Sequence, residues 1–131
     1  MNRFVATVKS IESTQNLNIV KFRFFDEILT MMSLELNQNI KLDSKVELSL
    51  KATHITIAKN LKGIISDSNQ LKAKIISINN GKLLSSVKLS LYDTTLESII
   101  TQKSSKQMNL KIGDNVSILI NPSELSIVKV I

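Results

Sequence analysis

The sequence consists of two copies of one pattern. Residues 2–11 and residues 69–78 align without a gap at an offset of 67 positions, and four of the ten positions are identical. Further aligned segments are 20–26 with 87–93 at the same offset, then 40–50 with 110–120 at an offset of 70. The second copy therefore carries three extra residues, around positions 103–107. Because a tandem repeat forces both copies into the same set of elements, we predict two units, residues 1–60 and residues 61–131.

Each copy is predicted to form short strands, since apolar and polar residues alternate within segments that turn residues separate. The predicted strands are 4–11, 17–25, 28–33, 45–50 and 55–58 in the first copy, and 71–78, 83–91, 94–101, 115–120 and 125–130 in the second. Asn79-Asn80-Gly81 is a hairpin signal, and the polar segment 102–108 predicts a helical turn. The pattern predicts an all-β fold of two tandem small OB-like five-stranded Greek-key barrels, each with a short helical turn.

The size of each unit predicts association. A unit of about 60 residues buries too little apolar surface for a robust core of its own. The edge strands of small barrels also need to be covered. We therefore expect the two units to pack together, and the chain to form a homo-oligomer, either a dimer or a trimer.

The composition limits the classes of partner that this chain is expected to bind. The net charge is +6 and the estimated pI is about 9.7, but only Arg3 and Arg23 are arginines and only five residues are aromatic. Few bases could stack on such a surface, so the composition argues against a nucleic-acid partner. No apolar run reaches the length of a membrane span, which predicts no membrane association. Cysteine is absent, which favours a cytoplasmic location.

The sequence predicts no enzyme. His54 is the single histidine and has no cysteine or acidic cluster near it, so a metal site or a catalytic triad is not predicted. The three glycines are too far apart to form a phosphate-binding loop. Asp26-Glu27 has the composition of a solvated turn. We expect neither a metal centre nor an organic cofactor.

Residues that suit a small anion gather in the middle of the chain. Lys51-Ala52-Thr53 follows one predicted strand, and Ser66-Asp67-Ser68-Asn69 precedes another. At such places successive backbone N–H groups can point the same way and form a nest for an anion. Hydroxyl groups add donors, and Lys51 adds a compact positive charge. Two ordinary turns would have a similar composition, so the residues alone leave both readings open.

The same segments resemble the molybdate-binding TOBE, or Mop, domain family in the tandem form of the molbindins. Residues 66–73 resemble the family's opening motif Ser-Ala-Arg-Asn-x-Leu-x-Gly, and residues 51–55 are very similar to its closing motif Lys-Ala-Ser/Thr-x-Val. Residues 96–101 look like Leu-x-Ala-x-Ile-Thr, and residues 108–116 contain a segment close to Leu-x-Leu-x-x-Gly-x-x-Val. The resemblance covers the whole chain twice.

The resemblance implies binding of molybdate or tungstate at sites between domains or subunits, for storage, buffering or homeostasis, without catalysis. The residues that it places at the oxyanion are Lys51, Ala52 and Thr53 of the closing motif, Ser66, Asp67, Ser68 and Asn69 of the opening motif, and the hydroxyl residues Thr101 and Ser123.

Departures from the family's motifs suggest an alternative. Ser68 replaces the arginine of the opening motif, and Asn121 replaces the lysine of the second closing motif, with Glu124 close by. A second register, which starts at Ala58-Lys59-Asn60, fits the opening motif but breaks the offset of 67. The alternative function is a degenerate TOBE pair that acts as a regulatory or assembly module of a molybdate transporter or regulator. An OB-like nucleic-acid binder is the less favoured third reading.

Overall fold

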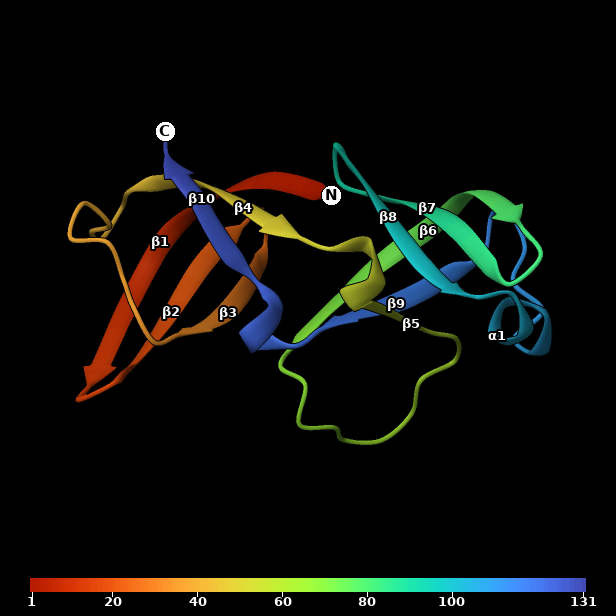
Figure 1. Cartoon of the computed structure of the whole chain (residues 1–131), viewed down its shortest axis with the longest axis horizontal. Coiled ribbons are helices and arrows are strands. Elements are labelled where there is room, and N and C mark those ends of the chain that lie inside the picture. The colour runs from red at the N-terminus through yellow and green to blue at the C-terminus, as the bar shows by residue number, and fades with distance from the viewer.

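The computed structural model describes all 131 residues and contains two five-stranded antiparallel sheets side by side (Figure 1). The first repeat contributes β1 (Asn2–Thr14), β2 (Leu17–Phe24), β3 (Glu27–Ser33), β4 (Lys45–Leu50) and β5 (Ile55–Ala58). The second contributes β6 (Asn69–Asn80), β7 (Leu84–Leu91), β8 (Thr94–Thr101), α1 (Gln102–Gln107), β9 (Asn115–Ile120) and β10 (Ser126–Val130). Short 3-10 turns, Ala52–His54 and Pro122–Glu124, precede β5 and β10. The predicted all-β tandem OB-like fold is confirmed.

The two repeats exchange their last strands. The order of one sheet is β10-β4-β1-β2-β3, and that of the other is β5-β9-β6-β7-β8. Ser126 of β10 pairs with Ser49 of β4, and Ile55 of β5 pairs with Ile120 of β9. In Figure 1 the blue β10 lies beside the yellow β4 of the first repeat. The division between residues 60 and 61 thus follows the sequence repeat, whereas each sheet is completed by a strand of the other repeat.

Equivalent residues of the two repeats meet, which shows that the halves are related by a pseudo-twofold axis. Phe25 stacks on Tyr92, 67 positions later, with ring centroids 4.5 Å apart and an interplanar angle of 5°. His54 Nδ1 lies 2.8 Å from Oε2 of Glu124, 70 positions later. Such contacts between equivalent positions are the signature of an isologous interface, here within one chain.

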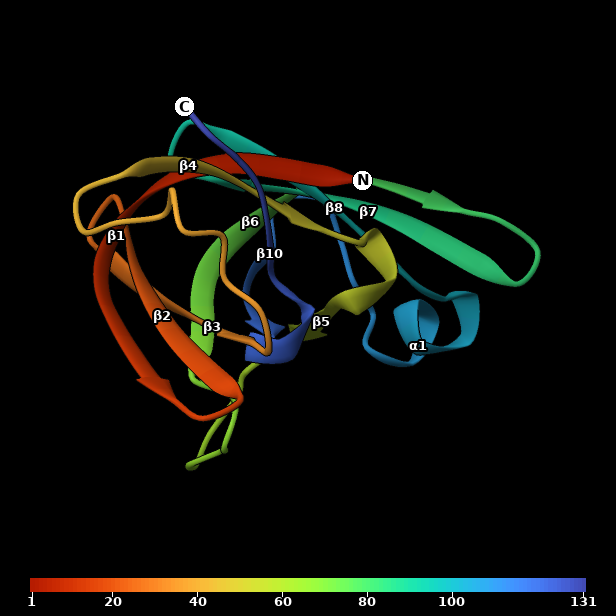
Figure 2. The same cartoon turned by 60° about the vertical axis from the view of Figure 1, so that its left-hand side comes forward.

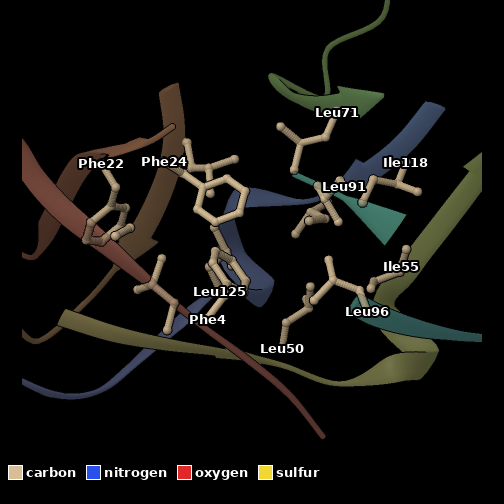
Figure 3. Close-up of a cluster of buried hydrophobic side chains, with 14 of the residues drawn as sticks. Phe4, Phe22, Phe24, Leu50, Ile55, Leu71, Leu91, Leu96, Ile118 and Leu125 are labelled. Atoms are coloured by element: carbon tan, nitrogen blue, oxygen red, sulfur yellow. The ribbon is translucent and has the colours of Figure 1, made fainter. Parts of the chain in front are cut away.

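One continuous core joins both halves. It contains 25 buried residues from both sheets. Figure 3 shows Phe4, Phe22, Phe24 and Leu50 facing Leu71, Leu91, Leu96 and Ile118, with Ile55 and Leu125 from the exchanged segments among them. Phe4 and Phe24 pack edge to face with centroids 5.0 Å apart. Two small barrels therefore share a core, as their size requires.

Matching bulges bend the long strands of the two repeats. The pairing of β1 with β2 shifts register between Val8 and Ser10, and that of β6 with β7 shifts between Ile75 and Ser77. A bulge increases the local twist and bends the strand. Each long strand therefore curls around its half of the core, as the turned view of Figure 2 shows for β1.

The three extra residues of the second repeat allow a helix between β8 and β9. Thr101 caps α1, because its Oγ1 accepts a hydrogen bond from the Ser104 N–H at 3.2 Å. Lys59 Nζ donates to the carbonyl oxygens of Met108 and Asn109, at 3.2 and 3.0 Å, just beyond the helix. Lys59 thus holds the end of β5 against the region that follows α1.

The first repeat has no helix at the corresponding position, so the short helical turn predicted for this unit is present only as the 3-10 turn Ala52–His54. Residues 34–44 run from β3 to β4 as turns and irregular chain. An apolar cavity of about 670 Å³ lies beside them, lined in part by Met31, Leu36 and Leu125. No helix anywhere in the structure is long and apolar enough to cross a membrane.

Candidate oxyanion-binding site

The first closing turn, Lys51–His54, presents free donors. The N–H of His54 donates to the Lys51 carbonyl at 2.9 Å, and the N–H of Ile55 donates to the Ala52 carbonyl. This pattern leaves the N–H groups of Ala52 and Thr53 without a partner in the turn, and no side chain caps it. Lys51 and Thr53 are exposed. Two backbone N–H groups, one hydroxyl and one ammonium group are therefore available to an anion.

The second closing turn, Asn121–Glu124, has the same backbone path but uses its donors internally. Oδ1 of Asn121 accepts from both the N–H and the Oγ of Ser123, at 3.0 and 2.8 Å. Pro122 has no N–H to offer. Ser123 was predicted to bind the oxyanion, but both its N–H and its hydroxyl donate to Asn121 instead. The two repeats therefore differ in chemistry at equivalent positions, and the first closing turn is the one that is open to a ligand.

The two closing turns share one small cavity. It has a volume of about 170 Å³, and Lys51, His54, Ser123 and Glu124 are among its lining residues, whereas Ala52 and Thr53 do not line it. The imidazole of His54 joins the carboxylate of Glu124 at 2.8 Å across the pseudo-twofold axis. The sequence analysis did not predict an acidic partner for His54. The offset of 70 between the two positions was the signal that could have revealed it.

The opening segment, Ser66–Asn69, lies at the same end of the second sheet but two strands away from the first closing turn. Ile55, Ile120 and Asn69 form one row across β5, β9 and β6. Ile55 and Asn69 are therefore about 10 Å apart, with Ile120 between them. The first closing turn and the opening segment therefore lead into two different strands of the second sheet.

Asn69 is tied into the contact between the two halves. Its side chain is fully buried, its Oδ1 accepts from the Thr30 N–H at 2.7 Å, and its Nδ2 donates to the Thr30 carbonyl at 2.8 Å. Asn2, the equivalent residue, binds the backbone of Glu97 in the same two-sided way, at 2.8 Å for each bond. Each asparagine thus docks the first strand of one repeat onto the third strand of the other.

Replacing Asn69 with alanine is expected to lower the free energy of unfolding by about 2–4 kcal/mol, because two hydrogen bonds are lost and the part-buried Thr30 N–H and carbonyl lose their partner. Urea unfolding followed by circular dichroism measures the change. Gln70→Ala is the matched control, since Gln70 is exposed and adjacent. A loss for Asn69→Ala no larger than for the control would contradict the docking role.

Asp67 carries an unusual carboxylate. Its Oδ1 is buried without a hydrogen-bond partner. Burial raises the pKa of Asp67 above its ordinary range, and the Asn69 N–H opposes this rise. A negative charge at this place weakens rather than strengthens the binding of an oxyanion. The structure therefore gives Asp67 no donor role toward an anion.

The pKa of Asp67 leads to a pH-dependent prediction. A raised carboxyl pKa in the folded state means that Asp67 favours folding at acidic pH, and that this contribution is lost as the pH rises through the folded-state pKa. Asp67→Asn is therefore expected to be more stable than the unsubstituted chain at pH 7. The difference in stability between the variant and the unsubstituted chain should become smaller as the pH falls toward the ordinary aspartate pKa of about 3.9. Thermal unfolding at both pH values measures it, and a variant that is less stable at pH 7 would refute this view.

Thr101 lies away from the closing turns. It ends β8 and caps α1, the helix on the right in Figure 1. Ser98 lies three residues earlier in β8. Its Oγ donates a hydrogen bond, at 2.8 Å, to the carbonyl of Ile55, the residue that directly follows the first closing turn. No group of three or more His, Cys, Asp or Glu side chains is arranged to hold a metal ion.

Comparison with known proteins identifies the class. The sequence model of the TOBE domain family matches residues 65–127. This match confirms the resemblance to the TOBE family that the sequence indicated. The first repeat has the same strands at the offsets of 67 and 70. A comparison with curated protein sequences gives no match.

A solved structure shares the whole architecture. It is that of the cytoplasmic molybdate-binding protein ModG with molybdate bound. The two structures superpose with a TM-score of 0.86 at 21% sequence identity, over 96% of this chain and 94% of that chain. The tandem arrangement of two OB-like units is thus common to both proteins.

Proposed function

We propose that this protein binds molybdate or tungstate at the first closing turn, without catalysis, and buffers or stores the oxyanion in the cytoplasm. The observation that carries the proposal is the free donor set of Lys51–Thr53, in a chain whose residues 65–127 match the TOBE domain model. A dianion gains charge-assisted hydrogen bonds from such donors, and these are about twice as strong as neutral ones.

The proposed site is completed by a second subunit. Within one chain the first closing turn and the opening segment lead into strands that are two positions apart in the second sheet, and Lys51 and Thr53 of the turn are exposed. Ile64, in the connection that leads to the opening segment, is 102% exposed relative to the free residue, which suits a contact with another chain. Binding and homo-oligomer formation are therefore linked in this proposal, and light scattering with and without molybdate tests the link.

Calorimetric titration with molybdate, tungstate and sulfate tests the proposed ligand. We expect heat with molybdate and tungstate, and weaker or no heat with sulfate, because the smaller anion spans fewer of the donors. Absence of heat with all three anions, on protein shown to be folded, would refute the proposal.

A second candidate function follows from the self-capped second closing turn. Asn121 and Pro122 remove the donors that the first turn keeps, so half of the chain lacks the chemistry for an oxyanion. If both turns were inert, the chain would serve as an assembly module of a molybdate transporter or regulator. The same titration distinguishes the two, since an assembly module gives no heat with any anion.

A further inference from the structure

A second groove lies on the first sheet, away from the closing turns. Its volume is about 770 Å³, and it runs between the outer face of β1, the end of β2 and the β7–β8 turn. The side chains that matter for its chemistry are Arg3, Arg23, Lys45, Thr7, Phe25 and Asp93. None of them belongs to the proposed oxyanion site.

Cations line one side of this groove. Arg3 and Arg23 are the chain's two arginines, and both border it. Thr7 of β1 pairs with Arg23 of β2 on one side and with Lys45 of β4 on the other. Residues paired in this way point to the same face, so Arg23 and Lys45 flank the Thr7 hydroxyl about 10 Å apart. Two long cationic side chains can therefore converge on an anion above Thr7.

These charges are available to a ligand. Arg23 and Lys45 form no ion pair within the chain, whereas Arg3 Nη1 lies 3.1 Å from Glu47 Oε1. Asp93 is the one carboxylate among the lining residues. Glu27 and Asp26 lie near the Tyr92 hydroxyl, whose pKa is raised first by burial and then by these two acids, and neither lines the groove. The groove keeps a positive excess.

An aromatic ring borders the same groove. Tyr92 covers one face of Phe25 with parallel planes, and the edge of Phe24 meets Phe25 at 87°. Phe25 nevertheless remains 47% exposed, and it is Phe25 rather than Tyr92 that lines the groove. The ring is therefore held rigidly from behind, with apolar surface left for a flat partner.

The backbone at Phe25 is strained for an aromatic residue. Its φ is +52°, in the left-handed region that favours glycine. Tyr92 has the same conformation, with a φ of +53°. Strain of this kind costs about 1–3 kcal/mol, and it persists where structure or function requires the residue. The stacking of the two rings accounts for the strained backbone of both residues. The exposed part of the Phe25 ring is available to a ligand in the groove.

The second repeat lacks this combination. Ser90, Lys74 and Asn115 stand at the positions that correspond to Arg23, Thr7 and Lys45. The scaffold is the same, so the arginine and the hydroxyl between two cations are specific to the first repeat rather than required by the fold.

We propose that this groove binds a nucleoside phosphate, with the phosphate between Arg23 and Lys45 above Thr7 and the base against Phe25. Arg23 lies two residues before Phe25, which places the cations and the ring about 7 Å apart along the strand, a gap that a sugar bridges. Arginine offers a phosphate two parallel hydrogen bonds, and a base gains stacking energy on an aromatic ring.

Adenosine 5′-monophosphate is the probe, and its binding to the full chain is followed by amide chemical shifts and calorimetry. Arg23→Gln and Phe25→Gly are each expected to weaken binding about tenfold, from the loss of charged hydrogen bonds and of stacking respectively. Glycine tolerates the positive φ at position 25, so this variant keeps the turn while it removes the ring. Lys88→Gln, which removes a charge from an exposed strand position of the second sheet, is expected to leave binding unchanged.

Three comparisons sharpen the test. Inorganic phosphate and adenosine should each bind at least about tenfold more weakly than the nucleotide. Phosphate contacts only the cations of the groove, and adenosine contacts only its aromatic ring. Lys51→Ala should not affect the nucleotide, so failure of the oxyanion proposal leaves this one standing. Binding of a single-stranded oligonucleotide with no binding of the mononucleotide would overturn the proposal, as would mononucleotide binding that survives both groove substitutions.

Discussion

Lys51→Ala is expected to weaken molybdate binding by about 10- to 150-fold, which corresponds to the loss of one hydrogen bond to a charged group. Lys51 is the ammonium group beside the free N–H groups of Ala52 and Thr53, and Asn121 replaces it in the second repeat. The N–H groups of Ala52 and Thr53 and the Thr53 hydroxyl are neutral donors, so Lys51 supplies the positive charge beside them. Calorimetry of the variant under the same salt conditions measures the change.

Lys103→Ala is the control for that measurement. Lys103 is also an exposed lysine, but it belongs to α1 in the three-residue insertion of the second repeat. Its removal changes the net charge by the same amount and should alter binding by less than about twofold, because distant surface charges are screened by salt. Equal losses for the two variants would show that the site is not at the first closing turn.

Separated halves of the chain are expected not to fold as monomers. A fragment of residues 61–131 lacks β5, which pairs with β9 and buries Ile55 and Ile57. Burial of two such side chains contributes about 3–6 kcal/mol, which is comparable with the whole stability of many domains. A fragment of residues 1–60 lacks β10 and the buried Leu125 in the same way. Circular dichroism and light scattering of each fragment measure the effect.

Mixing the fragments provides the control. Because the halves interlock through β5 and β10, an equimolar mixture should regain the strand signal of the intact chain as a 1:1 complex. The fragment 61–131 alone should gain structure only by exchanging β10 with a second copy, which makes it concentration-dependent. A folded, monomeric fragment 61–131 at low concentration would contradict the exchange of strands.

The repeat made most of the fold predictable from sequence. The offsets of 67 and 70 match each strand and each closing turn of one half with its counterpart, and all of these are present. The two bulges also lie at matching positions, but no sequence signal predicted them. The strand exchange was not predictable in this way. β5 and β10 follow equivalent turns and have equivalent patterns, so either could complete either sheet, and only the geometry of the shared core decides between them.

The candidate site was predictable in part. Lys51-Ala52-Thr53 was visible as a motif, and the structure shows its donors free. Asn69 was also visible as part of a motif, but its amide is used by Thr30, a contact between residues 39 positions apart. The pairing of His54 with Glu124 depends on the pseudo-twofold axis, which no local pattern encodes.

Diffraction from a crystal soaked in tungstate tests the central proposal most directly, because the heavy tungsten atom locates the ligand without any assumption about the site. We expect one strong anomalous peak per chain within hydrogen-bonding distance of the Ala52 and Thr53 N–H groups and of Lys51 Nζ, with a neighbouring chain completing its shell. No peak should lie at the second closing turn. A peak only at Asn121–Glu124, or no peak in a fully soaked crystal, would contradict the assignment of the site to the first closing turn.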